Sequence, residues 1–131
     1  MTPEQRRAIE WDCTRLINLY ANLGDAGRWE DVAALYVEDG TMARPSAPDK
    51  PIIGRAAILQ SFLARPFRAQ QHVFSNIVVE VESEDAASAH SGIVLYTGKD
   101  AAPLVGFYKD RMVRTEAGWR FAERVGGLTF S

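Results

Sequence analysis

The sequence predicts an α+β domain in which helices cover one face of a curved antiparallel sheet. Apolar residues recur at helical spacing through the first half of the chain, as far as Pro66. Alternating apolar and polar runs, typical of strands, fill the second half from Gln71 onward. With 131 residues and 47% hydrophobic content, the chain suits one globular domain over residues 1–131 with its own core.

The first helix is predicted to begin at Pro3 and to end near Gly24. Thr2 can cap its first turn, and Gln5 stands at the reciprocal position of a capping box. One apolar stripe at helical spacing follows, made of Ile9, Cys13, Leu16, Ile17 and Tyr20. Because the single cysteine lies on this stripe, we expect a packed thiol and not a nucleophile.

Two shorter helices and a short strand come next. The spacing from Trp29 to Tyr36 predicts the second helix, and a short strand follows at 41–43. The third helix opens at Gly54 and closes at Pro66, since proline cannot continue a helix. The helices therefore all precede the long strands.

Four long strands complete the chain. They are expected at 71–82, 87–97, 103–115 and 119–130, and turn residues separate them. Helices that are segregated from an antiparallel sheet pack on one of its faces. The space between the two layers is the expected ligand site.

Charge and cysteine content exclude several functions. The net charge of −2 is spread along the chain, so no basic stripe suits nucleic acid and no polybasic segment suits a membrane surface. No apolar run of about 18 residues could span a bilayer. One cysteine and the lack of a signal-like N-terminus favour the cytoplasm.

We expect neither a metal nor a cofactor. The two histidines, His72 and His90, and the distant Cys13 do not form a recognisable set of metal ligands. Gly126-Gly127 lacks the lysine and the following helix of a phosphate-binding loop. The expected partner is a small hydrophobic ligand.

A series of short motifs carries a family resemblance. They are Gly24-Asp25-x-x-x-Trp29, Asp39-Gly40, Ile53-Gly54-Arg55-x-x-Ile58, His72-x-x-x-Asn76, Gly106-x-Tyr108-x-Asp110 and Gly118-Trp119-Arg120. In this order and spacing the chain resembles the SnoaL-like branch of the nuclear-transport-factor-2-like superfamily, which includes scytalone dehydratase, ketosteroid isomerase and small subunits of ring-hydroxylating dioxygenases. The resemblance implies a cystatin-like roll, with a cone-shaped curved sheet wrapped around three N-terminal helices.

The resemblance also implies that Asp25 and His72 face each other across the mouth of the cone as a catalytic pair. A carboxylate fixes the tautomer of an imidazole, and a ring with an ordinary pKa of about 6.5 exchanges protons near neutrality. Alternatively, Asp25 caps the second helix and His72 is a polar residue on a half-wet strand.

Further substrate-binding residues are expected on the inner faces of the strands. Regular alternation puts Asn76 on the face of His72 and Phe74, where its amide could hold a substrate oxygen or a neighbouring backbone group. Tyr108 and Asp110 share another face, where they could bind a developing oxyanion. The alternative for Asp110 is a structural ion pair with Arg114 or Arg124.

Aromatic residues are expected to line the pocket or to fill the core. Those predicted to contact the substrate are Tyr20, Trp29, Phe74, Tyr96 and Tyr108. Gly24 stands where scytalone dehydratase has a tyrosine, and a second histidine is not matched, so we expect a substrate other than scytalone.

The sequence thus predicts a cofactor-independent dehydratase or isomerase acting on a small cyclic or aromatic compound. The alternative is a non-catalytic ligand-binding or assembly module, such as an oxygenase small subunit. Apolar side chains of 73–81 and 93–95 are expected on the exposed face of the sheet. We therefore expect a homodimer that pairs through this face.

Overall fold

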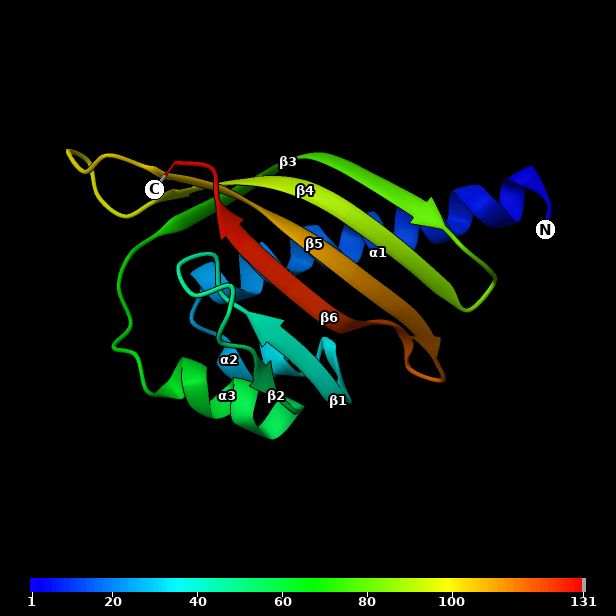
Figure 1. The fold of residues 1–131 in the computed structure, drawn as a ribbon, viewed down its shortest axis with the longest axis horizontal. Coiled ribbons are helices and arrows are strands. Elements are labelled where there is room, and N and C mark those ends of the chain that lie inside the picture. Colours follow the sequence, from blue (N-terminus) through cyan, green and yellow to red (C-terminus); the bar gives the residue numbers. More distant parts are fainter. Residues whose placement is uncertain (131) are drawn as a thin grey trace.

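The structure is a computed structural model that describes residues 1–130. Six strands form one curved open sheet with the order β2-β1-β6-β5-β4-β3, and helix α1 lies along it (Figure 1). The elements are α1 (Pro3–Asp25), α2 (Trp29–Ala33), β1 (Tyr36–Ala43), β2 (Ile52–Ile53), α3 (Arg55–Leu63), β3 (Gln71–Val81), β4 (Ala86–Tyr96), β5 (Leu104–Thr115) and β6 (Gly118–Leu128). The predicted α+β class is confirmed.

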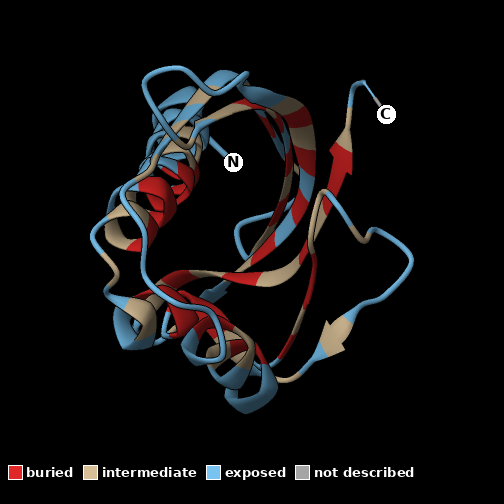
Figure 2. Ribbon diagram, turned by 90° about the vertical axis from the view of Figure 1, so that its left-hand side faces the viewer, coloured by how far each residue is buried: buried red, intermediate tan, exposed pale blue. Residues whose placement is uncertain are grey.

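Helix α1 begins and ends close to the predicted residues. The Thr2 hydroxyl accepts the Gln5 backbone N–H at 3.1 Å, and the Gln5 side chain accepts the Thr2 N–H at 2.8 Å. This capping box satisfies two N–H groups that the helix itself leaves unpaired. The predicted apolar stripe is buried, and Figure 2 shows that buried residues of the helix and the sheet face the interior.

The prediction that the second helix reaches Tyr36 is wrong, because α2 ends at Ala33 and Tyr36 begins strand β1. Tyr36 is fully buried and is paired with Phe121 of β6. The Leu35 carbonyl also accepts the Phe121 N–H at 2.8 Å. These contacts with a remote strand outweigh the local helical pattern. Strand β1 is therefore longer than predicted.

The four long strands β3 to β6 form an antiparallel meander, and their bounds agree with the prediction within about two residues. The sheet has one parallel pair, since β1 runs parallel to β6. The short strand β2 extends the sheet beyond β1. Neither the parallel pairing nor β2 was predicted.

Strand β3 contains a bulge. Its pairing with β4 shifts by one residue between Ser75 and Val78, and Asn76 has φ of 52°. Asparagine tolerates this left-handed conformation better than most residues do. A bulge bends its strand and adds local twist. Phe74 and Ile77, on the two sides of the bulge, both pack against the core.

The core fills the space between α1 and the inner face of the sheet. Its largest wholly buried apolar side chains are Ile17, Tyr36, Met42, Ile58, Met112 and Phe121. Cys13 is also wholly buried, as its place on the stripe predicted. Within residues 1–130, no helix is both long and apolar enough to cross a membrane.

Candidate active site

Asp25 and His72 lie together, as the resemblance implied. Asp25 is the last residue of α1, and His72 is the second residue of β3. One Asp25 carboxylate oxygen, Oδ2, accepts the His72 backbone N–H at 2.6 Å. The other, Oδ1, lies 2.6 Å from Nδ1 of the His72 ring. The pair therefore joins the end of the helix to the start of the strand.

The contact between Asp25 and His72 determines which ring nitrogen is free. A carboxylate accepts hydrogen bonds, so the proton of a neutral imidazole sits on Nδ1, which faces Asp25. Nε2 is then left as an unprotonated acceptor. The side chains are 16% exposed for Asp25 and 23% for His72, which leaves the ring accessible to a ligand.

His72 forms part of the wall of a cavity of about 220 Å³ between α1, α3 and the sheet. Much of the remaining lining is aromatic or aliphatic. The lining includes Tyr20, Trp29, Phe62, Phe74, Ile93 and Tyr108. Four of the aromatic residues predicted to contact a substrate therefore line this cavity.

Tyr108 presents a hydroxyl group to this cavity. Within residues 1–130 its phenol oxygen has no hydrogen-bond partner, although the ring is buried and lines the cavity. Burial raises the pKa of Tyr108, so the phenol keeps its proton near neutral pH. Tyr20 differs, because its hydroxyl is bound to that of Tyr36 at 2.8 Å. Tyr108 is therefore the better donor to a ligand oxygen.

Three residues predicted to bind substrate, Asn76, Tyr96 and Asp110, do not line the cavity. Asn76 is exposed, because the bulge in β3 inserts one residue and breaks the assumed alternation after Phe74. Tyr96 is 48% exposed at the end of β4. Conversely, Ile93 and Leu95 were expected on the outer face of the sheet but line the cavity.

Asp110 does not line the cavity either, since it forms a buried ion pair with Arg124. Both side chains are 0% exposed, and Arg124 donates to the two carboxylate oxygens at 2.7 and 3.2 Å. This is one of the two structural pairings considered for Asp110. Burial raises the pKa of the Asp110 carboxyl, although Arg124 opposes the shift.

Arg124 lies among aromatic rings beneath the cavity. Its guanidinium carbon is 4.1 Å from the centre of the Tyr108 ring and 4.4 Å from that of Tyr20. Phe121 and Phe74 follow at 4.5 and 5.2 Å. Burial lowers the pKa of the guanidinium, but Asp110 and the tyrosines raise it further, so the group stays charged. The rings thus stabilise the cation through their π faces.

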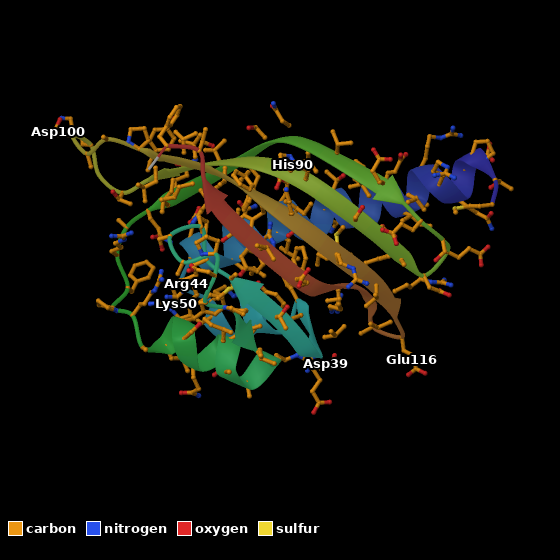
Figure 3. The ribbon with its side chains drawn as sticks, in the orientation of Figure 1. Asp39, Arg44, Lys50, His90, Asp100 and Glu116 are labelled. Atoms are coloured by element: carbon orange, nitrogen blue, oxygen red, sulfur yellow. The ribbon has the colours of Figure 1, made fainter. Side chains whose placement is uncertain are left out.

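Three arginines at the cavity were not predicted as site residues. Arg44 follows β1 and is half-buried, whereas Arg65 and Arg68 are exposed in the segment between α3 and β3. Figure 3 labels Arg44 near the loop that leads from β1 to β2. The available signal was a cluster of arginines near Pro45 and Pro66 in loops, but a loop sequence does not reveal where its side chains point.

The donor sets that hold metal ions in proteins consist mostly of histidine, cysteine, aspartate and glutamate side chains. In the part of the chain that the structure describes, no three of these side chains are grouped to hold an ion. Asp25 and His72 form a carboxylate–imidazole pair of the kind that can transfer a proton.

Comparisons with known proteins agree with this architecture. A protein from Novosphingobium aromaticivorans named as a candidate scytalone dehydratase is 25% identical, with a TM-score of 0.86 over 98% of this chain and 89% of that chain. A nuclear-transport-factor-2-like protein with a cystatin-like fold, from the same organism, is 27% identical. Its TM-score is 0.81 over 98% of this chain and 84% of that chain. No curated protein matches the sequence.

A third solved structure supports the fold alone. It is a candidate aromatic ring hydroxylase from the same organism, 22% identical, with a TM-score of 0.82 over 100% of this chain and 94% of that chain. The family described as the SnoaL-like domain matches residues 5–125, which include every element from the first turns of α1 to most of β6. This chain therefore belongs to the SnoaL-like domain family, with a nuclear-transport-factor-2-like, cystatin-like fold.

Proposed function

We propose that this protein is a cofactor-independent dehydratase or isomerase that moves a proton on a small hydrophobic cyclic or aromatic compound. The observation that carries the proposal is the 2.6 Å contact between Asp25 and the His72 ring at the wall of an apolar cavity. The candidate scytalone dehydratase, at 25% identity, supports the class of reaction. The fold alone supports none, because it hosts many activities.

His72 is the proposed general base. Its Nε2 takes a proton from a carbon next to a carbonyl group, and Asp25 stabilises the imidazolium that forms. In a dehydration, the imidazolium returns this proton to the leaving hydroxyl group, and water departs. In an isomerisation, it returns the proton to a different carbon. Neither step requires an electron acceptor.

Tyr108 is the proposed oxyanion donor. When the base removes the proton, negative charge develops on the carbonyl oxygen, and the Tyr108 hydroxyl can donate a hydrogen bond to it. The rings of His72 and Tyr108 are both neighbours of the Phe74 ring, with centroids 6.4 and 5.8 Å from it. A flat substrate lying against Phe74 could therefore contact both residues.

The size of the cavity limits the substrate. An apolar cavity of about 150 Å³ holds one benzene molecule. The present cavity, at about 220 Å³ and open at its mouth, suits a compound of one or two rings. Larger polycyclic substrates would extend into solvent.

Hydrogen exchange tests the proposal without knowledge of the natural substrate. One- and two-ring hydroxy-ketones and enones are incubated with the protein in deuterated water, and deuterium at the carbon next to the carbonyl is measured by mass spectrometry. We expect His72→Ala to slow catalysed exchange or turnover by about 10²- to 10⁴-fold, the usual contribution of a general base. Asp25→Asn should slow it similarly, since the two residues act as a unit.

The chain offers a matched control for each variant. His90, the other histidine, is exposed on β4 (Figure 3). It stacks on Phe107 and does not line the cavity, so His90→Ala should leave exchange unchanged. Asp85 is exposed and paired with Arg114, so Asp85→Asn should also be silent. Rates that are equal in wild type, His72→Ala and Asp25→Asn, with all three proteins folded, would refute catalysis by this pair and favour a ligand-binding role.

A further inference from the structure

The mouth of the cavity is positively charged. Its lining contains Arg44, Arg65 and Arg68, and it contains no aspartate or glutamate. The whole chain has the opposite balance, with 17 acidic and 15 basic residues. Asp25 lies behind His72, and Asp110 is neutralised by Arg124. A ligand that enters the cavity therefore meets three guanidinium groups and no exposed carboxylate.

These three arginines have N–H donors that are not used in hydrogen bonds within the described structure. Arg44 uses Nη2 to bind the Ser61 carbonyl at 3.0 Å, and Arg68 uses Nε to bind the Gln70 side chain at 3.3 Å. A guanidinium group has five N–H donors, so most of them remain available. In the described part of the chain, the ion pairs of arginine involve Arg7, Arg28, Arg114 and Arg124 instead.

Arg65 lies close enough to Arg44 and to Arg68 for its positive charge to interact unfavourably with each of them. Burial lowers the pKa of Arg44, and the charge on Arg65 lowers it further. Burial likewise lowers the pKa of Arg65, and Arg68 adds to this shift. The Tyr108 phenol acts on both Arg44 and Arg65, so the cluster extends from the mouth towards the proposed oxyanion donor. A bound anion would relieve the repulsion.

We propose that Arg44, Arg65 and Arg68 bind a carboxylate group of the substrate, so that the substrate is a one- or two-ring carboxylic acid in its anionic form. The planar guanidinium fork matches a carboxylate in a bidentate manner. The rings of the compound would occupy the apolar cavity, and its charged group would stay at the mouth. This inference rests on the proposed function, because it assumes that the compound in the cavity is the substrate whose reacting carbon lies beside His72.

A matched pair of ligands tests the inference. Naphthalene-2-carboxylate and naphthalene-2-carboxamide have nearly the same shape and differ in one charge. Their dissociation constants are measured by isothermal titration calorimetry with the full chain. We expect the carboxylate to bind about tenfold more tightly at low salt. The preference should mostly disappear in about 1 M salt, where the Debye length falls to about 3 Å.

Single arginine variants locate the effect. Arg65→Gln should reduce the preference for the carboxylate several-fold, and its fold should be unaffected because Arg65 is exposed and makes no ion pair in the described structure. Arg44→Gln should act in the same direction. Arg7→Gln is the control, since it removes one positive charge at the far end of α1 and should leave the preference intact.

Two outcomes overturn the inference. One is equal affinity of the wild type for the two compounds, and the other is a preference that persists unchanged in both Arg44→Gln and Arg65→Gln. The same titrations with His72→Ala separate this inference from the proposed function. A preference that survives in His72→Ala supports the carboxylate site whether or not the pair is catalytic. Exchange that depends on His72 but shows no preference for anions would leave the proposed function standing alone.

Discussion

The buried pair of Asp110 and Arg124 allows a quantitative prediction about stability. Changing Asp110 to Asn keeps the volume of the side chain but leaves the Arg124 cation, 0% exposed, without a counter-charge. Removing one partner of a buried ion pair costs about 3–5 kcal/mol. Because the four surrounding rings still stabilise the cation, we expect Asp110→Asn to cost about 3 kcal/mol, the lower end of that range.

Removing Arg124 should have a different consequence, because a carboxyl group can take up a proton and a guanidinium group cannot release one. Burial already raises the pKa of Asp110 while Arg124 opposes it. In Arg124→Met the opposition is gone, so the folded pKa rises further above the unfolded value of about 3.9. The folded state then binds more protons than the unfolded state. The stability of Arg124→Met should therefore fall as pH rises from about 4 through the raised folded pKa.

Urea unfolding, followed by circular dichroism at about pH 5 and about pH 8, measures both effects. The stability of Arg124→Met, expressed as its difference from wild type, should be greater at about pH 5 than at about pH 8. Asp110→Asn should show no comparable gain at the lower pH. The double variant, with Asp110→Asn and Arg124→Met, should cost less than the sum of the two single changes. A cost below about 1 kcal/mol for Asp110→Asn, or greater stability of Arg124→Met at the higher pH, would refute this reasoning.

Two other features lead to predictions. Burial, together with Asp12, raises the pKa of the Cys13 thiol to about 12, so its contribution to stability is complete below the unfolded pKa of about 8.5 and is lost as pH rises towards 12. Between about pH 8 and pH 10, wild type should therefore lose about 2 kcal/mol more than Cys13→Ala in urea unfolding, and equal losses would contradict the assignment. The outer face of the sheet exposes Val73 (40%) and Val78 (55%), and the predicted dimer through this face should become monomeric in Val78→Lys. Light scattering that finds a monomeric wild type at micromolar concentration would disprove it.

The features that the sequence predicted correctly are those that depend on local patterns of residues. The capping residues Thr2 and Gln5 and the alternation of the long strands are short-range signals, and the structure follows them. The pairing of Asp25 with His72 joins residues 47 apart in sequence, and only the family resemblance pointed to it.

The errors have a common physical origin, since each depends on contacts that are remote in sequence. Tyr36 lies in a strand and not in a helix because it pairs with β6. Asn76 is exposed because one extra residue is inserted in β3 where it pairs with β4. The arginines at the cavity mouth lie in loops, whose side-chain directions follow from the elements that they connect. A single sequence contains no local pattern for any of these.

The bulge at Asn76 bends strand β3 without changing which of its neighbouring side chains face inward. It adds one residue to β3 opposite the paired strand, and the residues that face inward, Phe74 before it and Ile77 after it, keep their orientation. Deleting Asn76 would restore two-residue alternation without turning any of these side chains around. Such a deletion would straighten the strand while retaining His72 on the inner face. A change of one residue in length would therefore alter the bend of β3, whose Phe74 lines the cavity, and leave the same side chains facing inward.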